Sequence, residues 1–211
     1  PFHFIEEAER NGMIVPIGYQ LLDMICQQQR QRISMNHKLV PIAANISAPQ
    51  LMDPEFASKV EALLLKYQLP PDALELEITE TSLMTDTQKA INQLNQLRAL
   101  GIHIAIDDFG TGYSSLTYLR HLPLNQLKID QSFVKDLLVD KSDAAIVATI
   151  IAMAESLELE TIAEGVETVA ELELLRKMGC DTFQGYYFSK PVPATELQSQ
   201  ICQPIRAVSN R

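Results

Sequence analysis

Six polar residues lie at the ends of short apolar segments that we expect to be strands: Asn45, Glu77, Asp107, Lys128, Glu164 and Gln184. One acidic residue after a strand is most often a helix cap or a solvated loop residue, but six polar strand ends in succession are hard to explain that way. The first three, with Asp108, offer only oxygen ligands, a set that favours Mg²⁺ or Mn²⁺ over Zn²⁺. Adjacent aspartates repel each other unless a cation or a proton separates them, so the pair at 107–108 indicates a metal bridge.

The loop that begins at this pair reads DDFGTGYSS over residues 107–115 and contains two glycines. Glycine permits positive φ angles and a close approach of the backbone. The triplet Asp-Phe-Gly also occurs at the magnesium site of protein kinases. A kinase additionally needs a glycine-rich loop and a His-Arg-Asp loop, which this chain lacks, so we reject that interpretation.

The elements that must position these side chains alternate along the chain between short apolar strands and amphipathic helices. Two helices come first, over 6–10 and from Pro16 to about Ile33. Strands are then predicted over 39–45, 74–79, 102–107, 126–130, 161–164 and 182–184, and helices over 54–67, 86–100, 115–121, 144–157, 169–178 and 194–201. This alternation predicts parallel pairing and an α/β fold.

Two α/β architectures compete, an open doubly wound sheet and a closed (β/α)8 TIM-like barrel. An open sheet places its site at one switch point, whereas a barrel collects residues from the carboxyl ends of many strands, as found here. Because a barrel has eight strands and about six βα units are present, we expect about two strands upstream of Pro1. Residues 1–211 are therefore predicted to be one barrel domain that is incomplete at its N-terminus.

Composition excludes several classes of protein. Seventeen basic against 27 acidic residues give a net charge of −10, which argues against binding a nucleic-acid polymer or an anionic membrane surface. Three scattered cysteines suggest neither a disulfide framework nor a zinc site. The chain shows no signal peptide, so we expect a cytoplasmic domain; the sequence leaves open whether the full-length protein is anchored to a membrane.

Five sequence motifs, taken together, are specific enough to indicate one known family. They are Glu77-Ile78-Thr79-Glu80, the DDFGTGYSS loop, Lys128-Ile129-Asp130, Ala163-Glu164-Gly165-Val166-Glu167 and Asp181-Thr182-Phe183-Gln184-Gly185-Tyr186. In this order and spacing, the chain resembles the EAL-domain phosphodiesterases of bacterial cyclic di-GMP signalling from about Phe4 to Pro191. The resemblance implies metal-dependent hydrolysis of cyclic di-GMP to linear pGpG.

The resemblance also implies roles for individual residues. One metal ion would be bound by Asn45, Glu77 and Asp107, and a second by Asp107, Asp108 and Glu164. Lys128 would orient the attacking water, and Glu164 is the candidate proton acceptor. Glu80 would anchor the glycine loop, while Gln184, Glu167 and Asn45 would lie on the substrate side. Partners implied are cyclic di-GMP, a second copy of the chain and an upstream sensory domain.

One departure from the family pattern concerns the Glu-Ala-Leu motif, which supplies a further metal ligand and is missing from an early strand. Its expected place coincides with the strands predicted upstream of Pro1, so we interpret the difference as truncation and expect this chain alone to be inactive. The main alternative is a receptor that binds cyclic di-GMP without cleaving it. A magnesium-dependent barrel enzyme that forms an enolate from a small carbonyl compound would use the same oxygen ligands, but it would not explain the DDFGTGYSS loop.

Overall fold

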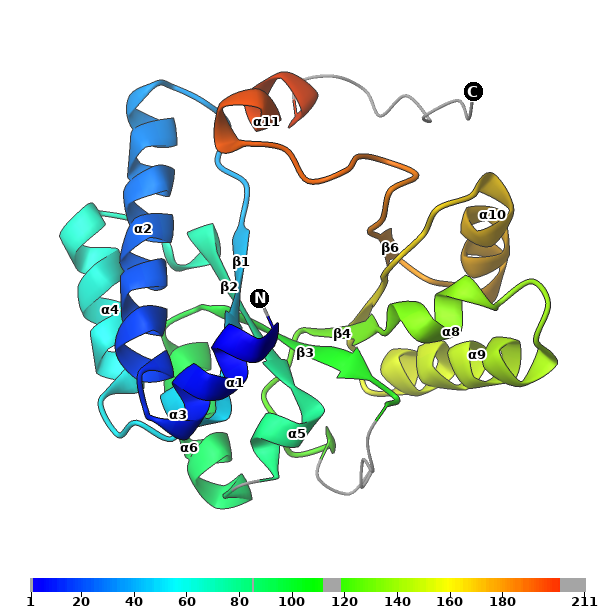
Figure 1. Ribbon diagram of the computed structural model, residues 1–211, viewed down its shortest axis with the longest axis horizontal. Helices are drawn as coiled ribbons and strands as arrows, with labels where there is room; N and C mark the ends of the chain where they lie inside the picture. The colour runs from blue at the N-terminus through cyan, green and yellow to red at the C-terminus, as the bar shows by residue number, and fades with distance from the viewer. Residues whose placement is uncertain (1, 85, 112–118, 202–211) are drawn as a thin grey trace. The chain divides into compact units, whose positions relative to one another are not determined.

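The computed structural model describes residues 2–84, 86–111 and 119–201, and these form two compact units (Figure 1). Of the described residues, the first unit comprises 2–84, 86–107 and 119–125, and the second comprises 108–111 and 126–201. Among the described residues no helix combines the length and the apolar character that crossing a membrane requires.

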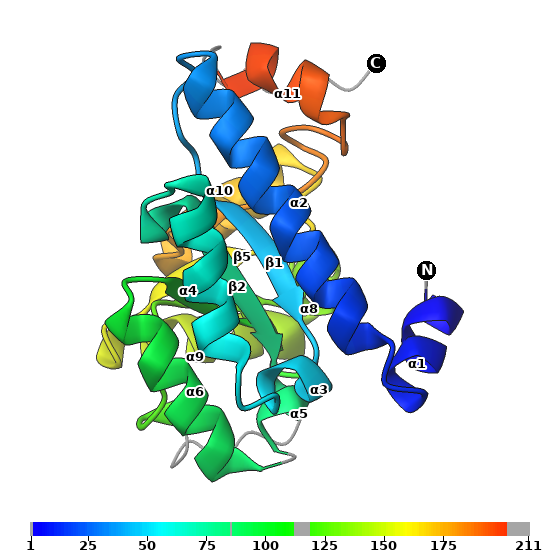
Figure 2. The same cartoon turned by 90° about the vertical axis from the view of Figure 1, so that its left-hand side faces the viewer.

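The first unit begins with α1 (Phe2–Arg10) and α2 (Ile14–Ser34) and continues, in its described residues, as two strand–helix repeats and a third strand. Its further elements are β1 (Ile42–Ile46), α3 (Ala48–Leu51), α4 (Phe56–Tyr67), the 3₁₀ helix η1 (Pro71–Ala73), β2 (Leu74–Thr79), α5 (Glu80–Leu83), α6 (Thr87–Ala99) and β3 (His103–Phe109). Both β1 with β2 and β2 with β3 pair in parallel. Helices α2, α4 and α6 lie side by side along one face of β1 and β2 (Figure 2).

The second unit continues the same alternation with shorter strands. It contains β4 (Gln126–Ile129), α8 (Gln131–Lys135), α9 (Lys141–Ser156), β5 (Glu160–Ala163), α10 (Val169–Met178), β6 (Thr182–Phe183) and α11 (Ala194–Ile201). β4 pairs with β5 and β5 with β6, again in parallel. The α/β prediction with parallel strands is therefore confirmed within each unit.

Helix α10 illustrates how local sequence sets the bounds of an element. Thr168 and Glu171 form a capping box, in which the Thr168 hydroxyl accepts from the Glu171 N–H at 3.2 Å and the Glu171 carboxylate accepts from the Thr168 N–H at 2.9 Å. The helix ends at Gly179, whose φ of +94° is left-handed and suits glycine. The helix consequently spans the predicted residues 169–178.

Three short helices, α3, α5 and α8, were not predicted, and each begins directly after a strand or one residue later. The helix predicted over 115–121 falls mostly outside the described residues. That the chain forms a single domain, and that further strands precede Pro1, stay predictions.

Candidate functional site

In the first unit, strand register brings three predicted ligands onto one face. Asn45 is the lateral partner of Glu77, and Glu77 is the lateral partner of Ala105, two residues before Asp107. Because side chains two apart on a strand share a face, Asn45, Glu77 and Asp107 point to the same side. Asn45 is exposed, whereas Glu77 and Asp107 are only 8% and 9% exposed. The strand register thus places these three residues on one face of the sheet.

The opposite face of these strands is aliphatic and explains the register. Leu76 and Ile78 of β2 are each 1% exposed, and Ile104 and Ile106 of β3 are 0% and 1% exposed. A slip of one residue would exchange these side chains with the carboxylates, so burial of the aliphatic face fixes where the carboxylates point.

In the second unit, Lys128 and Glu164 form a buried ion pair. The Lys128 Nζ lies 2.8 Å from Glu164 Oε1, and the two side chains are 4% and 17% exposed. Glu164 follows β5 and its N–H still donates to the Ile129 carbonyl at 3.1 Å, so the strand ladder itself aligns the two residues. Gly165 then turns with φ of +69°, where a Cβ would come within 2.6 Å of the Gln131 Cβ, so only glycine fits beside Glu164.

Asp108 belongs to the same cluster. Carboxylate oxygens of Asp108 and Glu164 lie within 4.8 Å of each other, and Asp107 precedes Asp108 in the chain. Asp108 has a φ of 52°, a left-handed conformation that aspartate tolerates better than most residues and that turns the chain immediately after Asp107. Like charges this close are stabilised by a cation or a proton between them, so an all-oxygen donor set of this kind fits Mg²⁺ or Mn²⁺.

Asp130, which contacts Asp108, has no role among those expected from the sequence. Burial raises the pKa of its carboxyl, but hydrogen bonds with the Ser132 hydroxyl and N–H and with Asp108 outweigh that effect and hold the pKa below its usual value. Asp130 also caps α8, accepting from the Ser132 N–H at 2.8 Å. The sequence could have indicated Asp130 through its place in the Lys128-Ile129-Asp130 motif, two residues after the buried lysine.

Gln184 and Glu167 are both exposed and follow the carboxyl ends of β6 and β5. The Gln184 N–H donates to the Ala163 carbonyl at 2.8 Å, and its carbonyl accepts from the Val166 N–H at 3.0 Å. At Gly185 a Cβ would lie 2.1 Å from the Val166 carbonyl oxygen, so glycine is required for this close approach. Gln184 is therefore held beside the segment that carries Glu167.

Glu80 is 4% exposed, at the first position of α5. Its Oε2 is buried and has no hydrogen-bond partner among the described residues. Most of the loop that it is predicted to anchor, residues 112–118, lies outside the described part of the chain, so this role stays a prediction.

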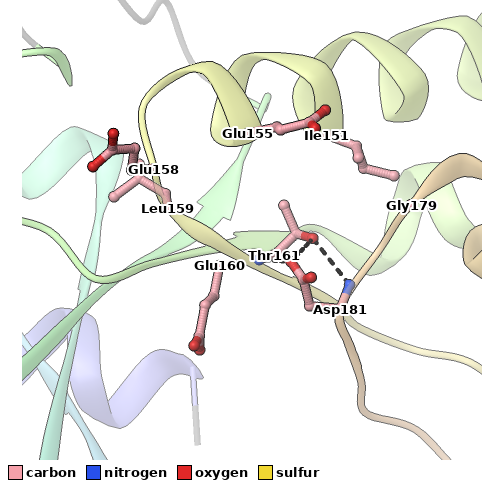
Figure 3. Close-up of a pocket in the computed structure, with 8 residues that line it drawn as sticks. All are labelled: Ile151, Glu155, Glu158, Leu159, Glu160, Thr161, Gly179 and Asp181. Carbon is pink, nitrogen blue, oxygen red and sulfur yellow. Dashed lines mark hydrogen bonds between the residues drawn. The ribbon is translucent and has the colours of Figure 1, made fainter.

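A cavity of about 350 Å³ in the second unit lies at the opposite end of β5 from Glu164 (Figure 3). It is lined by Glu155, Glu158, Glu160 and Asp181 among others. Asp181 is engaged within the fold, since its carboxylate accepts from the Thr161 N–H and hydroxyl, both at 3.0 Å. None of the predicted site residues lines this cavity.

Comparison with known proteins yields consistent matches. The model of the EAL domain family matches residues 1–191. The bifunctional diguanylate cyclase/cyclic di-GMP phosphodiesterase MucR of Pseudomonas aeruginosa is 43% identical over 201 residues, which are 95% of this chain and 29% of MucR. The cyclic di-GMP phosphodiesterase NbdA of the same organism is 42% identical over 198 residues, 94% of this chain and 25% of NbdA. The chain thus spans less than a third of the length of these relatives.

Solved structures agree with the fold. The structure of the PaMucR phosphodiesterase in complex with c-di-GMP superposes with a TM-score of 0.88 at 44% identity, over 93% of this chain and 80% of that chain. The EAL enzyme Bd1971, in its cAMP- and cyclic-di-GMP-bound form, gives a TM-score of 0.88 at 38% identity, over 94% of this chain and 55% of that one. These likenesses confirm the predicted fold class. With a family model that matches nearly the whole chain and relatives above 40% identity, the chain belongs to the EAL domain family.

Proposed function

We propose that this domain hydrolyses cyclic di-GMP to linear pGpG with the help of two Mg²⁺ or Mn²⁺ ions. The observation that carries the proposal is the buried Lys128–Glu164 pair beside the Asp108 carboxylate. An ammonium 2.8 Å from a carboxylate can orient a water while the carboxylate accepts its proton, which hydrolysis uses and ligand binding alone does not require. The names of MucR and NbdA and the c-di-GMP in the PaMucR structure support the substrate.

The two proposed ligand sets have Asp107 in common. Asn45, Glu77 and Asp107 would hold one ion, and Asp107, Asp108 and Glu164 would hold the second. When bound, the two ions supply positive charge that lowers the pKa of a water and neutralises the phosphodiester oxygens during in-line displacement.

The remaining roles fall to side chains of this chain. The Lys128 ammonium donates a hydrogen bond that orients the attacking water, and Glu164, 2.8 Å from Lys128, accepts the proton that the water releases. Gln184, Glu167 and Asn45 contact the dinucleotide. Glu80 anchors the glycine loop that starts at Asp108.

The protein environment belongs to the same proposal. Because the matched relatives are more than three times longer than the matched region, we expect further domains, including a sensory domain upstream. We place this domain in the cytoplasm and expect it to form a homodimer, which sedimentation at micromolar concentration would test.

The decisive experiment follows cyclic di-GMP and pGpG by chromatography in the full-length protein with Mg²⁺ or Mn²⁺. Turnover should be lost in Asp107→Asn, which removes the shared ligand. Glu160→Gln, at the opposite end of β5, is the control and should be as active as wild type. Ca²⁺ should support binding with little turnover, because its longer bonds and looser geometry disturb the in-line arrangement. Tight binding by wild type without hydrolysis under any of these ions would instead identify a receptor.

A further inference from the structure

The connection that follows β1 contains a buried glutamine that the function described so far does not use. Gln50, in α3, is 2% exposed. Its Oε1 accepts two hydrogen bonds from one residue, the Ser47 hydroxyl at 2.9 Å and the Ser47 N–H at 3.3 Å. Ser47 is the N-cap of α3 and comes two residues after Asn45. The buried amide therefore fixes the turn that ends the strand of a proposed ligand.

The Gln50 side-chain amide packs against Gly18 of α2. A Cβ built at Gly18 would come 1.8 Å from Gln50 Nε2 and 2.3 Å from its Cδ. The side chain consequently lies directly against the α2 backbone. Although the end of a glutamine is flexible, this one cannot withdraw without breaking both bonds to Ser47.

The far end of α3 is also held. The Asp53 carboxylate accepts from the Tyr19 hydroxyl at 2.7 Å and from Lys59 at 3.1 Å. The Asp53 carbonyl accepts from the Gln93 amide at 2.7 Å. Three helices, α2, α4 and α6, thus contact the downstream part of the connection, and at its upstream end Ser47 is hydrogen-bonded to Gln50.

We propose that Gln50, seated on Gly18, is the positioning residue for Asn45. It acts through the Ser47 turn and sets where the Asn45 carboxamide stands next to Glu77, its lateral partner in β2. Residues that orient a metal ligand typically change metal affinity or activity by roughly 10–100-fold when they are lost. This inference rests on the proposed function, because it assigns Asn45 to a metal ion.

The test uses the full-length protein and Mn²⁺ as the probe. Gln50→Leu should weaken Mn²⁺ binding, followed by electron paramagnetic resonance, by roughly tenfold or more and lower kcat/KM in parallel. Gly18→Ala should reproduce the Gln50→Leu defect, although alanine is otherwise the better helix former.

Gln29→Leu is the matched control. Gln29 is 0% exposed and donates to the Val40 and Ala73 carbonyls, both at 2.7 Å, near the opposite ends of β1 and β2 from Asn45. Its loss should lower the thermal midpoint while Mn²⁺ affinity is kept.

Wild-type Mn²⁺ affinity in folded Gln50→Leu, or equal losses of affinity in Gln50→Leu and Gln29→Leu, would overturn the inference while leaving the proposed function intact. A wild-type protein that neither binds Mn²⁺ nor turns over cyclic di-GMP would refute the proposed function and the inference with it. If Gln50→Leu does not fold, the Gly18→Ala protein decides by the same criteria.

Discussion

Replacing Lys128 by methionine should destabilise the metal-free protein through the charge that it leaves behind. The Lys128 and Glu164 side chains are 4% and 17% exposed and lie 2.8 Å apart. Removing one partner of a buried pair costs roughly 3–5 kcal/mol, since the other charge loses its compensation. Because Glu164 keeps some contact with water, we expect the lower value, about 3 kcal/mol. For a chain of 211 residues this corresponds to a fall in Tm of roughly 6–12 °C.

The assay is calorimetry in EDTA, with the transition of this domain followed in single and double variants. Lys128→Met combined with Glu164→Leu should recover most of the lost stability, because well-packed apolar pairs often replace buried ion pairs without cost. Lys59→Met is the surface control: its side chain is 41% exposed and pairs with Asp53 and Glu55, and solvent screens such pairs, so its loss should change Tm much less than Lys128→Met does. A double variant whose loss equals the sum of the two single losses would refute the reasoning. Lys128→Met, Glu164→Leu and the double variant should all be inactive. The double variant would then be stable without being active, so that stability and catalysis are measured separately.

Three further outcomes are expected. Glu80→Ala should lower turnover while the circular dichroism spectrum and Tm stay near wild type; global unfolding would make Glu80 a core residue instead. Gly185→Ala should weaken cyclic di-GMP binding in calorimetry, because a Cβ there would lie 2.1 Å from the Val166 carbonyl oxygen, and unchanged affinity would argue against the role of this segment. The hydrogen bond from the Glu55 N–H is the main cause that lowers the pKa of Asp53 below its ordinary value of 3.8, and the Tyr19 and Lys59 side chains add to it. The Asp53 carboxylate therefore stabilises the fold above that pH. Asp53→Asn should accordingly be less stable than wild type at neutral pH, with the difference vanishing in acid titrations as the pH falls through the lowered pKa; a constant difference down to pH 2 would contradict this.

Much of the fold was predictable because its strands alternate in polarity and its helices carry capping signals. β2 and α10 occur where the sequence predicts them, since Leu74–Thr79 alternates strictly and Thr168 and Gly179 mark the ends of α10. The short helices α3, α5 and α8 were missed, because four or five residues are too few to show a helical period. Tertiary contacts create such elements, as the Gln50 amide on Gly18 illustrates.

The sequence predicted which residues form the site better than it predicted how they are arranged. Strand parity placed Glu77 and Asp107 on one face, as the register confirms. The left-handed turn at Asp108 and the hydrogen bond between Asp108 and Asp130 depend on how the chain folds back, which no local pattern encodes. The roles of Gln184 and Glu167 stay predictions, although the backbone around both is tightly held.

The order of strand pairing has a consequence for synthesis on the ribosome. Ile42 pairs with Leu74, Glu75 with His103, and Gln126 with Glu160, about thirty residues apart in each case, and Ile162 pairs with Thr182, twenty residues further on. At translation rates of about 5–20 residues per second, the partner of a nascent strand is made within a few seconds. Within each unit, pairing can therefore advance in the direction of translation, one strand–helix repeat at a time. The unpaired edge of a nascent strand, which could otherwise pair with another nascent chain, is therefore covered soon after the strand leaves the ribosome.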